Sequence, residues 1–361
     1  MRRLIISNTH FQTIVAIQLK LTLFAEDQVT LIISDHSRRS EKVADELKKI
    51  NIFEDVKYIK TREIIDSYNK KQDYIDFFMN SFGKSLFSIF YVDELKNKNF
   101  DELIVYNLGY DIFDLHCFLI EFNRKIGVSR FEEGILSYDL REVETKKLHL
   151  STFLRSMRGR RSLYNSRRNF YCFFPKIYRG KYMPIKIPEI NRNGECVEIL
   201  KKIFGYHIED NMYTQKYIFF TSVYDFEGGK PIGEFELVKR IADLVGMDNL
   251  LVKIHPRDTR TIYKEYGFHI DPNSSIPWEV IQLCNDFSEK VFLTATSGSV
   301  MAGSFMSNKP VKTWYLFELC DISDNYAINT VNEIKRILSD ESIKENLLCV
   351  KIAKTLNDIY E

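Results

Sequence analysis

Short apolar segments alternate with amphipathic segments along most of the chain, and this alternation limits the folds open to it. The clearest, Leu250-Leu-Val-Lys-Ile254, has four apolar residues around one lysine and predicts a strand buried on both faces. Comparable strands are expected at 4–7, 29–34, 56–59, 102–106, 128–131, 217–221, 291–294 and 310–315. Segments such as 40–50 and 234–245 carry apolar residues at helical spacing. The alternation predicts an α/β protein with doubly wound parallel sheets and helices on both faces.

Other stretches show helical spacing less regularly. Further helices are expected at about 11–24, 61–96, 111–123 and 331–338, and from residues 278 and 299 onward. A last helix is expected over 345–360, and one course open to it is to cross back onto the first domain.

A basic and aromatic segment interrupts the alternation at 145–187. It contains no acidic residue, many lysines and arginines, and interleaved tyrosines and phenylalanines. We therefore expect an N-terminal domain over 1–150, a linker over 151–188 and a C-terminal domain over 189–361. The composition of the segment fits a solvated linker, a dimer contact, a membrane-surface patch or an RNA surface, and these alternatives stay open at this point.

Composition excludes several classes of protein. The formal net charge of +1 gives no support to a nucleic-acid-binding protein. The six cysteines are scattered without a Cys-x-x-Cys pair, which favours reduced thiols in the cytoplasm. We identify no signal peptide and no apolar run of membrane-spanning length. No Asp-x-Asp follows a strand and no His/Cys spacing suggests ligands, so we expect no required metal and no cofactor.

Polar residues follow three of the expected strands, at the edge where open α/β sheets bind ligands. Glu132 and Glu133 follow one strand and precede Gly134, which can adopt positive φ. Two adjacent carboxylates repel, so the pKa of one should rise toward values suited to a general base. The alternative is an ordinary solvated turn.

The other two strand ends lie in the second half of the chain. His255 precedes Pro256, which cannot continue a sheet ladder, and a bound phosphate would raise a histidine pKa from about 6.5. Thr296, Ser297 and Ser299 occupy a strand-to-helix turn, where they can cap a helix, contact a phosphate, or do both. The alternative for His255 is packing at a strand end.

In this order, the Glu-Glu-Gly, His-Pro and Ser/Thr segments resemble those of the bacterial sialyltransferases. The segment Ile5-Ile-Ser-Asn-Thr-His-Phe-Gln-Thr13 resembles the opening of glycosyltransferase family 52, which sialylates lipooligosaccharides and capsules. That family usually has Thr-Pro-aromatic-Gln, and His10 stands where its proline would be. The resemblance implies two Rossmann-like domains facing across a cleft (GT-B type), with the acceptor on the first and the nucleotide sugar on the second.

The resemblance also implies roles for individual residues. Glu132 is the expected general base, and Asp225, early in the second domain, is the alternative base. The structural explanation of Asp225 is that its carboxylate stabilises a turn beside two glycines. His255 is expected to contact the phosphate as an acid or electrostatic stabiliser. The resemblance places Glu279 at the ribose, although from the sequence alone a first-turn helix glutamate is the better explanation. The expected donor-binding residues are His255, Pro256, Glu279, Thr296, Ser297 and Ser299, and Asn8, Thr9, Glu133 and Gly134 are expected to line the cleft.

The resulting expectation is an inverting, metal-independent transfer of sialic acid from CMP-sialic acid to a terminal sugar, foremost galactose, of a capsule or lipooligosaccharide. The acceptor is expected to be lipid-linked, with the enzyme in the cytoplasm at the inner membrane face, contacting the membrane through 146–182. A homodimer is a further expectation, and nucleic acid is not an expected partner. One alternative is a family 52 hexosyltransferase that uses another nucleotide sugar. The other is a non-catalytic glycan- or nucleotide-binding assembly factor, which would bind CMP without turnover.

Overall fold

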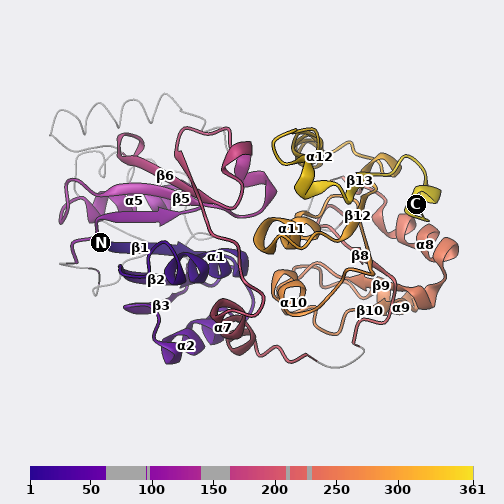
Figure 1. Cartoon of the computed structure of the whole chain (residues 1–361), viewed down its shortest axis with the longest axis horizontal. Helices are drawn as coiled ribbons and strands as arrows, with labels where there is room; N and C mark the ends of the chain where they lie inside the picture. The colour runs from indigo at the N-terminus through magenta and orange to yellow at the C-terminus, as the bar shows by residue number, and fades with distance from the viewer. Residues whose placement is uncertain (62–94, 96–97, 140–162, 209–211, 226–229, 361) are drawn as a thin grey trace. The chain divides into compact units, whose positions relative to one another are not determined.

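A computed structural model describes residues 1–61, 95, 98–139, 163–208, 212–225 and 230–360 of the 361-residue chain (Figure 1). The chain divides into two compact units. The first comprises Met1–Glu133 and Ser137–Pro188, and the second comprises Gly134–Leu136 and Glu189–Glu361. The helices expected over 61–96 fall almost entirely outside the described residues.

The first unit contains a seven-stranded sheet in the order β3-β2-β1-β4-β5-β6-β7. The strands are β1 (Arg2–Ser7), β2 (Gln28–Ser34), β3 (Asp55–Ile59), β4 (Glu102–Val105), β5 (Gly127–Phe131), β6 (Arg167–Cys172) and β7 (Met183–Lys186). Every neighbouring pair is parallel. The strand order reverses between β1 and β4, and this reversal creates the switch point at which α/β sheets bind ligands.

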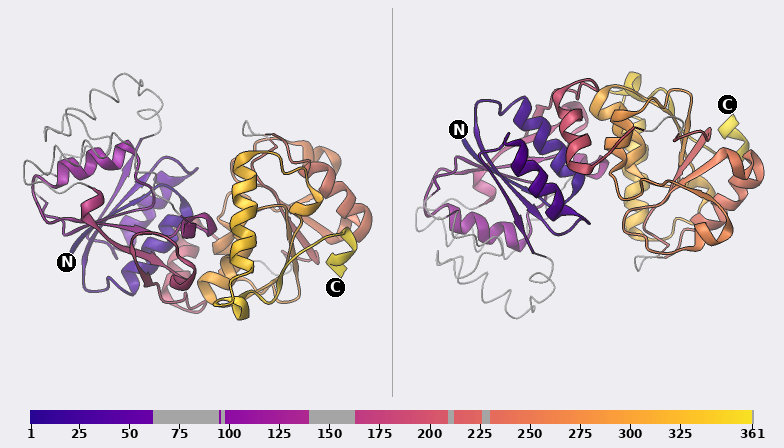
Figure 2. Two further views of the ribbon diagram at one scale, coloured as in Figure 1. Left: turned by 90° about the horizontal axis from the view of Figure 1, so that it is seen from above. Right: turned by 90° about the horizontal axis from the view of Figure 1, so that it is seen from below.

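Helices cover both faces of this sheet (Figure 2). Helices α1 (His10–Leu21) and α2 (Ser40–Ile50) lie on one side, and α5 (Tyr110–Leu119) lies on the other. Successive side chains of a strand point to opposite faces, so Leu4 and Ile6 of β1 join Leu115 of α5 in one hydrophobic core. Burial on both faces explains why β1 and β2 each contain a run of neighbouring apolar residues.

The end of the first unit differs from the linker expected over 151–188. Strands β6 and β7 extend the first sheet, with Phe170 and Cys172 fully buried. Pro184 is accommodated because β7 is an edge strand, where a missing N–H breaks no ladder bond. The arginines of β6 concealed its strand character in the sequence. The basic residues between 140 and 162 lie outside the described part of the chain.

The second unit contains a six-stranded parallel sheet in the order β10-β9-β8-β11-β12-β13. Its strands are β8 (Tyr217–Phe220), β9 (Leu250–Lys253), β10 (His269–Ile270), β11 (Val291–Thr294), β12 (Lys312–Tyr315) and β13 (Val350–Ile352). Its helices are α7 (Glu195–Phe204), α8 (Glu234–Val245), α9 (Ile262–Tyr266), α10 (Trp278–Cys284), α11 (Ala302–Ser307) and α12 (Asn325–Leu338). The strand order reverses between β8 and β11.

Helices α8 and α9 cover one face of the second sheet, and α10 and α11 lie on the other (Figure 1). The aromatic core on the α10 side is built around Trp278, whose ring centroid lies 4.7 Å from that of Phe220 and 5.6 Å from that of Phe292. Both units thus have one doubly wound parallel sheet, and the predicted fold class of two Rossmann-like α/β domains is confirmed.

The prediction of a helix over 345–360 is wrong. The segment contains a short 3-10 helix (Lys344–Leu347), strand β13, and a second 3-10 helix (Leu356–Tyr360). Strand β13 pairs with β12, so the segment completes the second sheet. Ile359 is fully buried in the core of the same unit, and the Tyr360 hydroxyl donates to the Leu244 carbonyl oxygen at 2.6 Å. The described end of the chain therefore packs on the second unit.

Candidate functional site

The residues singled out in the sequence lie at the carboxyl edges of the two sheets. In the first unit, Asn8 follows β1 and Glu132 follows β5. In the second, His255 follows β9 and Thr296 follows β11. Parallel strands deliver all their carboxyl ends to one edge, so each unit gathers its own set of polar side chains there.

Glu132 is a buried carboxyl group, with 1% of the residue exposed. The Tyr138 hydroxyl donates to its Oε2 at 2.5 Å, and the Phe173 amide donates to the same oxygen at 2.9 Å. Burial raises the pKa of Glu132 to about 7, and the two hydrogen bonds oppose that rise. The raised pKa expected from the sequence is present, but burial is its leading cause and repulsion by Glu133 is not.

Gly134 has φ of +70°, so the expected left-handed turn follows the two glutamates. The Gln12 side-chain amide of α1 donates to Glu133 Oε2, and its carbonyl Oε1 accepts from the Asn8 amide at 2.6 Å. The fully buried Gln12 thus brings Asn8 and the Glu-Glu-Gly turn together. Gln12 is the glutamine of the 5–13 segment, and its role in joining these two parts of the site was not predicted from the sequence.

The ends of β1 and β2 carry further polar side chains. The Ser34 hydroxyl donates to Asn8 Oδ1 at 2.8 Å and lies 2.8 Å from His36 Nδ1. The Thr9 hydroxyl accepts from the Gln12 amide at 3.3 Å and so caps α1. Asn8 therefore belongs to a polar edge, whereas Thr9 has a capping role.

Asp225 has both carboxylate oxygens engaged by backbone amides. Oδ1 accepts from Ile232 at 2.7 Å and Oδ2 accepts from Glu234 at 3.1 Å. The carboxylate thus holds the turn that leads into α8, which corresponds to the structural alternative considered from the sequence. This geometry gives less support to Asp225 as the base than to Glu132.

Glu234 is a further buried carboxyl group, which was not predicted from the sequence. It is the first residue of α8, it is fully buried, and it accepts from the Ser222 amide at 2.8 Å. Burial raises its pKa to about 8, and nearby Asp225 adds to the rise. A glutamate in a first helical turn is usually solvated, so the sequence offered no signal of its burial.

His255 lies two residues beyond β9 and is half-buried. Its amide donates to Thr221 Oγ1 at 2.8 Å, and its Nδ1 accepts from the Arg257 amide at 3.2 Å. Burial and the nearby Arg257 charge lower the pKa of His255 to about 4, below the value near 6.5 expected from the sequence. At neutral pH the imidazole is therefore uncharged, and because Nδ1 is an acceptor, its proton is on Nε2. Pro256 is exposed beside it.

Glu279 and the Ser/Thr turn meet in the second unit. Ser299 hydrogen-bonds the Glu279 carboxyl group in the first turn of α10, and burial raises the pKa of that carboxyl group. The Ser297 carbonyl oxygen accepts from the Tyr315 hydroxyl at 3.1 Å, and Thr296 is buried. The helix expected from residue 299 is a 3-10 turn (Gly298–Met301) followed by the six-residue α11.

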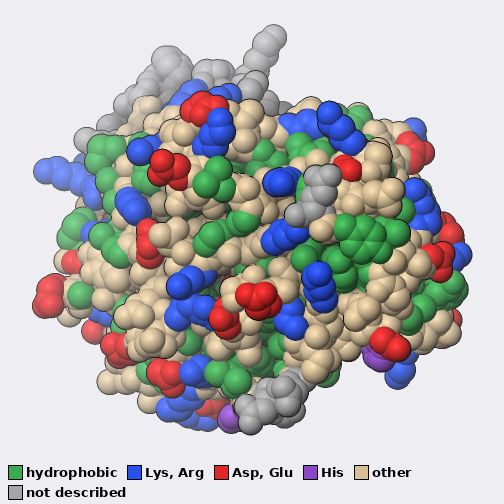
Figure 3. Space-filling view, turned by 45° about the vertical axis from the view of Figure 1, so that its right-hand side comes forward, with side chains coloured by type: hydrophobic (Ala, Val, Ile, Leu, Met, Phe, Trp, Pro, Cys, Tyr) green, Lys and Arg blue, Asp and Glu red, His purple; other side chains and the backbone are tan. Residues whose placement is uncertain are grey.

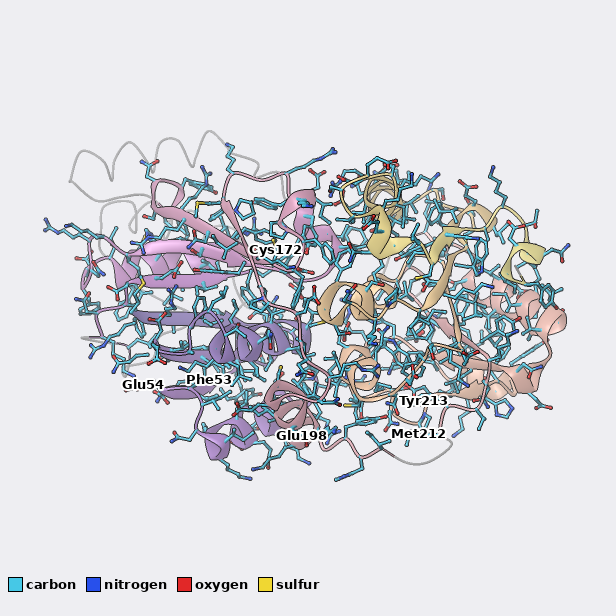
Figure 4. The ribbon with its side chains drawn as sticks, in the orientation of Figure 1. Phe53, Glu54, Cys172, Glu198, Met212 and Tyr213 are labelled. Carbon is cyan, nitrogen blue, oxygen red and sulfur yellow. The ribbon has the colours of Figure 1, made fainter. Side chains whose placement is uncertain are left out.

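Two surface hollows lie at the opposite, amino edges of the sheets. One of about 380 Å³ is lined by Asp27, Phe53 and Glu54 of the first unit, two of which are labelled in Figure 4. Another of about 720 Å³ is lined by Arg192 and Lys309 among other residues of the second unit. Neither contains a residue proposed from the sequence.

The described residues offer neither a cluster of metal ligands nor a helix able to span a membrane. In the part of the chain that the structure describes, no three His, Cys, Asp or Glu side chains gather as metal ligands would. Among the same residues, no helix combines the length and apolar character needed to cross a membrane.

Comparison with known proteins identifies one family. A family model described as alpha-2,8-polysialyltransferase matches residues 3–300, whereas no curated protein matches. An alpha/beta-galactoside alpha-2,3-sialyltransferase from Photobacterium phosphoreum is similar in structure, with 14% identity, coverage of 99% of this chain and 98% of that chain, and a TM-score of 0.49. A sialyltransferase from Photobacterium damselae is also similar, with 12% identity, coverage of 98% of this chain and 100% of that chain, and a TM-score of 0.47. A UDP-N-acetylglucosamine 2-epimerase has 13% identity, coverage of 96% of this chain and 90% of that chain, and a TM-score of 0.47.

The family model spans most of the chain, including the Glu-Glu-Gly, His-Pro and Ser/Thr segments. The resemblance to bacterial sialyltransferases is thereby confirmed, and it rests on the family model alone. The chain belongs to the alpha-2,8-polysialyltransferase family.

Proposed function

We propose that the protein transfers sialic acid from CMP-sialic acid to a sugar of a bacterial surface glycan, with inversion and without a metal. The observation that carries the proposal is the buried Glu132 carboxyl group, in a chain that belongs to a polysialyltransferase family. A carboxyl group with a pKa of about 7 exchanges protons at neutral pH, as a general base must. Glu132 is therefore preferred over Asp225 as the group that activates the acceptor.

His255 is proposed to stabilise the leaving phosphate of the donor. As a neutral imidazole with its proton on Nε2, it can donate a hydrogen bond without first being protonated. Negative charge grows on the phosphate as the sugar leaves, so this donor is most effective in the transition state. Pro256, Thr296, Ser297 and the linked Ser299 and Glu279 are proposed to bind the rest of the nucleotide.

The acceptor is proposed to carry a terminal galactose. The description of the family favours a second candidate, because an alpha-2,8-polysialyltransferase adds sialic acid to sialic acid. Asn8, the Glu133 carboxylate and Gly134 are proposed to line the acceptor side. A hexosyltransferase that uses another nucleotide sugar and a non-catalytic assembly factor remain the alternatives to be tested.

The remaining proposals concern location. The acceptor is taken to be lipid-linked, and the protein to work in the cytoplasm at the inner face of the membrane, with contact through 146–182. Support comes from the acid-free, basic and aromatic composition of that segment. A homodimer is also proposed, and sedimentation velocity over a range of protein concentrations would test it.

Product analysis tests the function directly. The protein is incubated with CMP-sialic acid or a panel of UDP-sugars, with galactose-terminated or sialic-acid-terminated acceptors, and with or without EDTA. We expect sialylated product from CMP-sialic acid alone and the same rate in EDTA. Transfer only from a UDP-sugar, or CMP binding without turnover, would overturn the proposal. A rate lost in EDTA and restored by Mg²⁺ would overturn the metal-free mechanism.

A further inference from the structure

One oxygen of the Glu132 carboxyl group is held by two donors. Phe173 and Tyr138 both donate to Oε2, and the Phe174 amide donates to the Tyr138 hydroxyl oxygen at 3.2 Å. An amide N–H can only donate, so Tyr138 accepts from Phe174 and directs its own proton to Glu132. With Oε2 already accepting two hydrogen bonds, a proton on this carboxyl group belongs on Oε1.

We propose that Tyr138 is a positioning residue, which reserves Oε2 as an acceptor and thereby makes Oε1 the atom that takes the proton of the acceptor hydroxyl. The inference rests on the proposed function and assigns a residue of the 3-10 helix Ile135–Asp139 to the same site. In the step it describes, the acceptor O–H bond breaks and its proton passes to Oε1. The acceptor oxygen forms a bond to the anomeric carbon of sialic acid, and the bond from that carbon to the phosphate oxygen breaks, with its electron pair leaving on CMP.

The described groups that face Glu132 carry no positive charge, so the hydrogen bond from Tyr138 is the contact that can adjust the pKa of its carboxyl group. Cys172 faces it from β6 and lies inside the first unit (Figure 4), and Glu133 follows it in the chain. Burial raises the pKa of both the Cys172 thiol and the Tyr138 phenol, so both are neutral at neutral pH. No ion pair of Glu132 is found among the described residues. Its ionised form thus depends on the two hydrogen bonds to Oε2.

Tyr138→Phe tests the inference, because it removes one donor and keeps the ring. A hydrogen bond to a charged group is worth enough to move a pKa by about one unit. We expect the rising limb of the plot of kcat against pH to move to higher pH by about one unit. At pH values below the limb, kcat should fall about tenfold relative to the wild type. At pH values above the limb, kcat should be close to that of the wild type, and KM should change little. Glu132→Gln should be inactive at every pH.

Tyr171→Phe is the matched control. It also removes a buried hydroxyl from this unit, but one that donates to Glu102 at 3.1 Å, so the limb should not move. If Tyr138→Phe fails to fold, 3-fluorotyrosine placed at 138 retains both the ring and the hydroxyl that donates to Glu132. Fluorine makes the phenol a stronger donor, so the limb should then move to lower pH.

The outcomes separate this inference from the proposed function. A limb unmoved by either change at 138, with Glu132→Gln inactive, overturns the inference and leaves the function standing. Full activity in Glu132→Gln overturns both the base and its positioning. Absence of sialyl transfer by the wild type overturns the function itself.

Discussion

His255 presents a neutral N–H at the edge of the second sheet, and this property leads to a kinetic prediction. His255→Ala removes a donor that acts mainly in the transition state, so kcat should fall by about 10²–10³ with a smaller change in KM. The residue lies at a strand end and is half-buried, so the fold should persist. Steady-state kinetics and thermal unfolding measure the two effects.

His269→Ala provides a control in the same unit, because its exposed imidazole pairs with Asp248 away from the carboxyl edge. Its turnover should match that of the wild type. Equal rates in His255→Ala and the wild type would remove His255 from the mechanism.

Glu234 leads to a prediction about stability and pH. Its pKa rises from 4.5 in the unfolded chain to about 8 in the folded protein. The folded protein therefore binds the Glu234 proton more tightly than the unfolded chain does. The stabilisation of the fold by this proton is complete below pH 4.5 and is lost as the pH rises through about 8. The glutamine side chain in Glu234→Gln stays neutral at every pH. The difference between the Tm of this variant and that of the wild type should therefore rise between pH 5 and pH 9, in favour of the variant. Each pH unit in this window costs the wild type up to about 1.4 kcal/mol, or about 2–5 °C.

Scanning calorimetry at several pH values measures this difference. Glu236→Gln, at an exposed position of the same helix, should show no such trend. A Glu234→Gln variant whose Tm stays at a constant offset from the wild type would contradict the buried, protonated carboxyl group.

At the residue scale, the sequence identified strand-end groups but not their environments. It placed Glu132 and His255 correctly after apolar strands, because the residues that form a buried strand are local in sequence. It could not show the depth of Glu234 or the low pKa of His255, because burial depends on elements far along the chain. One partner of Glu133 is likewise 121 residues away, at Gln12.

At the scale of elements, strands with several neighbouring apolar residues were predicted, whereas β6 and β13 were not. Strand β6 begins with two arginines and β13 is interrupted by Lys351, so neither has the composition of a buried central strand. Both lie in the outer part of their sheets, where one side of a strand tolerates polar side chains. Position within a sheet follows from topology, which composition does not reveal.

The corrected end of the chain leads to a packing prediction. Ile359 is fully buried in the core that contains α8, so Ile359→Ala should destabilise the second unit by about 2–5 kcal/mol. Denaturant unfolding measures the loss. Ile328→Ala in α12 is the matched control, because Ile328 is 36% exposed, and it should lower the free energy of unfolding far less. Equal stability in the two variants would show that the tail is not part of this core.

At the scale of the whole molecule, charge is distributed unevenly along the sequence. On the face shown in Figure 3, basic and acidic side chains are interspersed over the described residues. The acid-free 145–187 segment contains Arg158, Arg160 and Arg161 close together, outside the described residues. Each basic group near an anionic membrane contributes about 1 kcal/mol, so reversing these three charges should sharply weaken binding to vesicles containing phosphatidylglycerol.

Vesicle co-sedimentation measures that binding, and activity on a soluble acceptor should survive. Reversal of Lys42, Lys48 and Lys49 on α2 changes net charge equally and should leave vesicle binding nearly intact. Unchanged binding after reversal of the arginines would assign the segment to a linker or a dimer contact.

The late position of β6 and β7 has a consequence for how the nascent chain matures. Strand β5 ends at Phe131, yet the strand that covers its outer edge begins at Arg167. At about 5–20 residues per second, a ribosome leaves the edge of β5 unpaired for several seconds. An unpaired apolar strand edge is a template for intermolecular pairing. Chaperones that bind during translation, or slower growth at low temperature, should therefore raise the soluble yield by protecting an intermediate that the finished protein no longer contains.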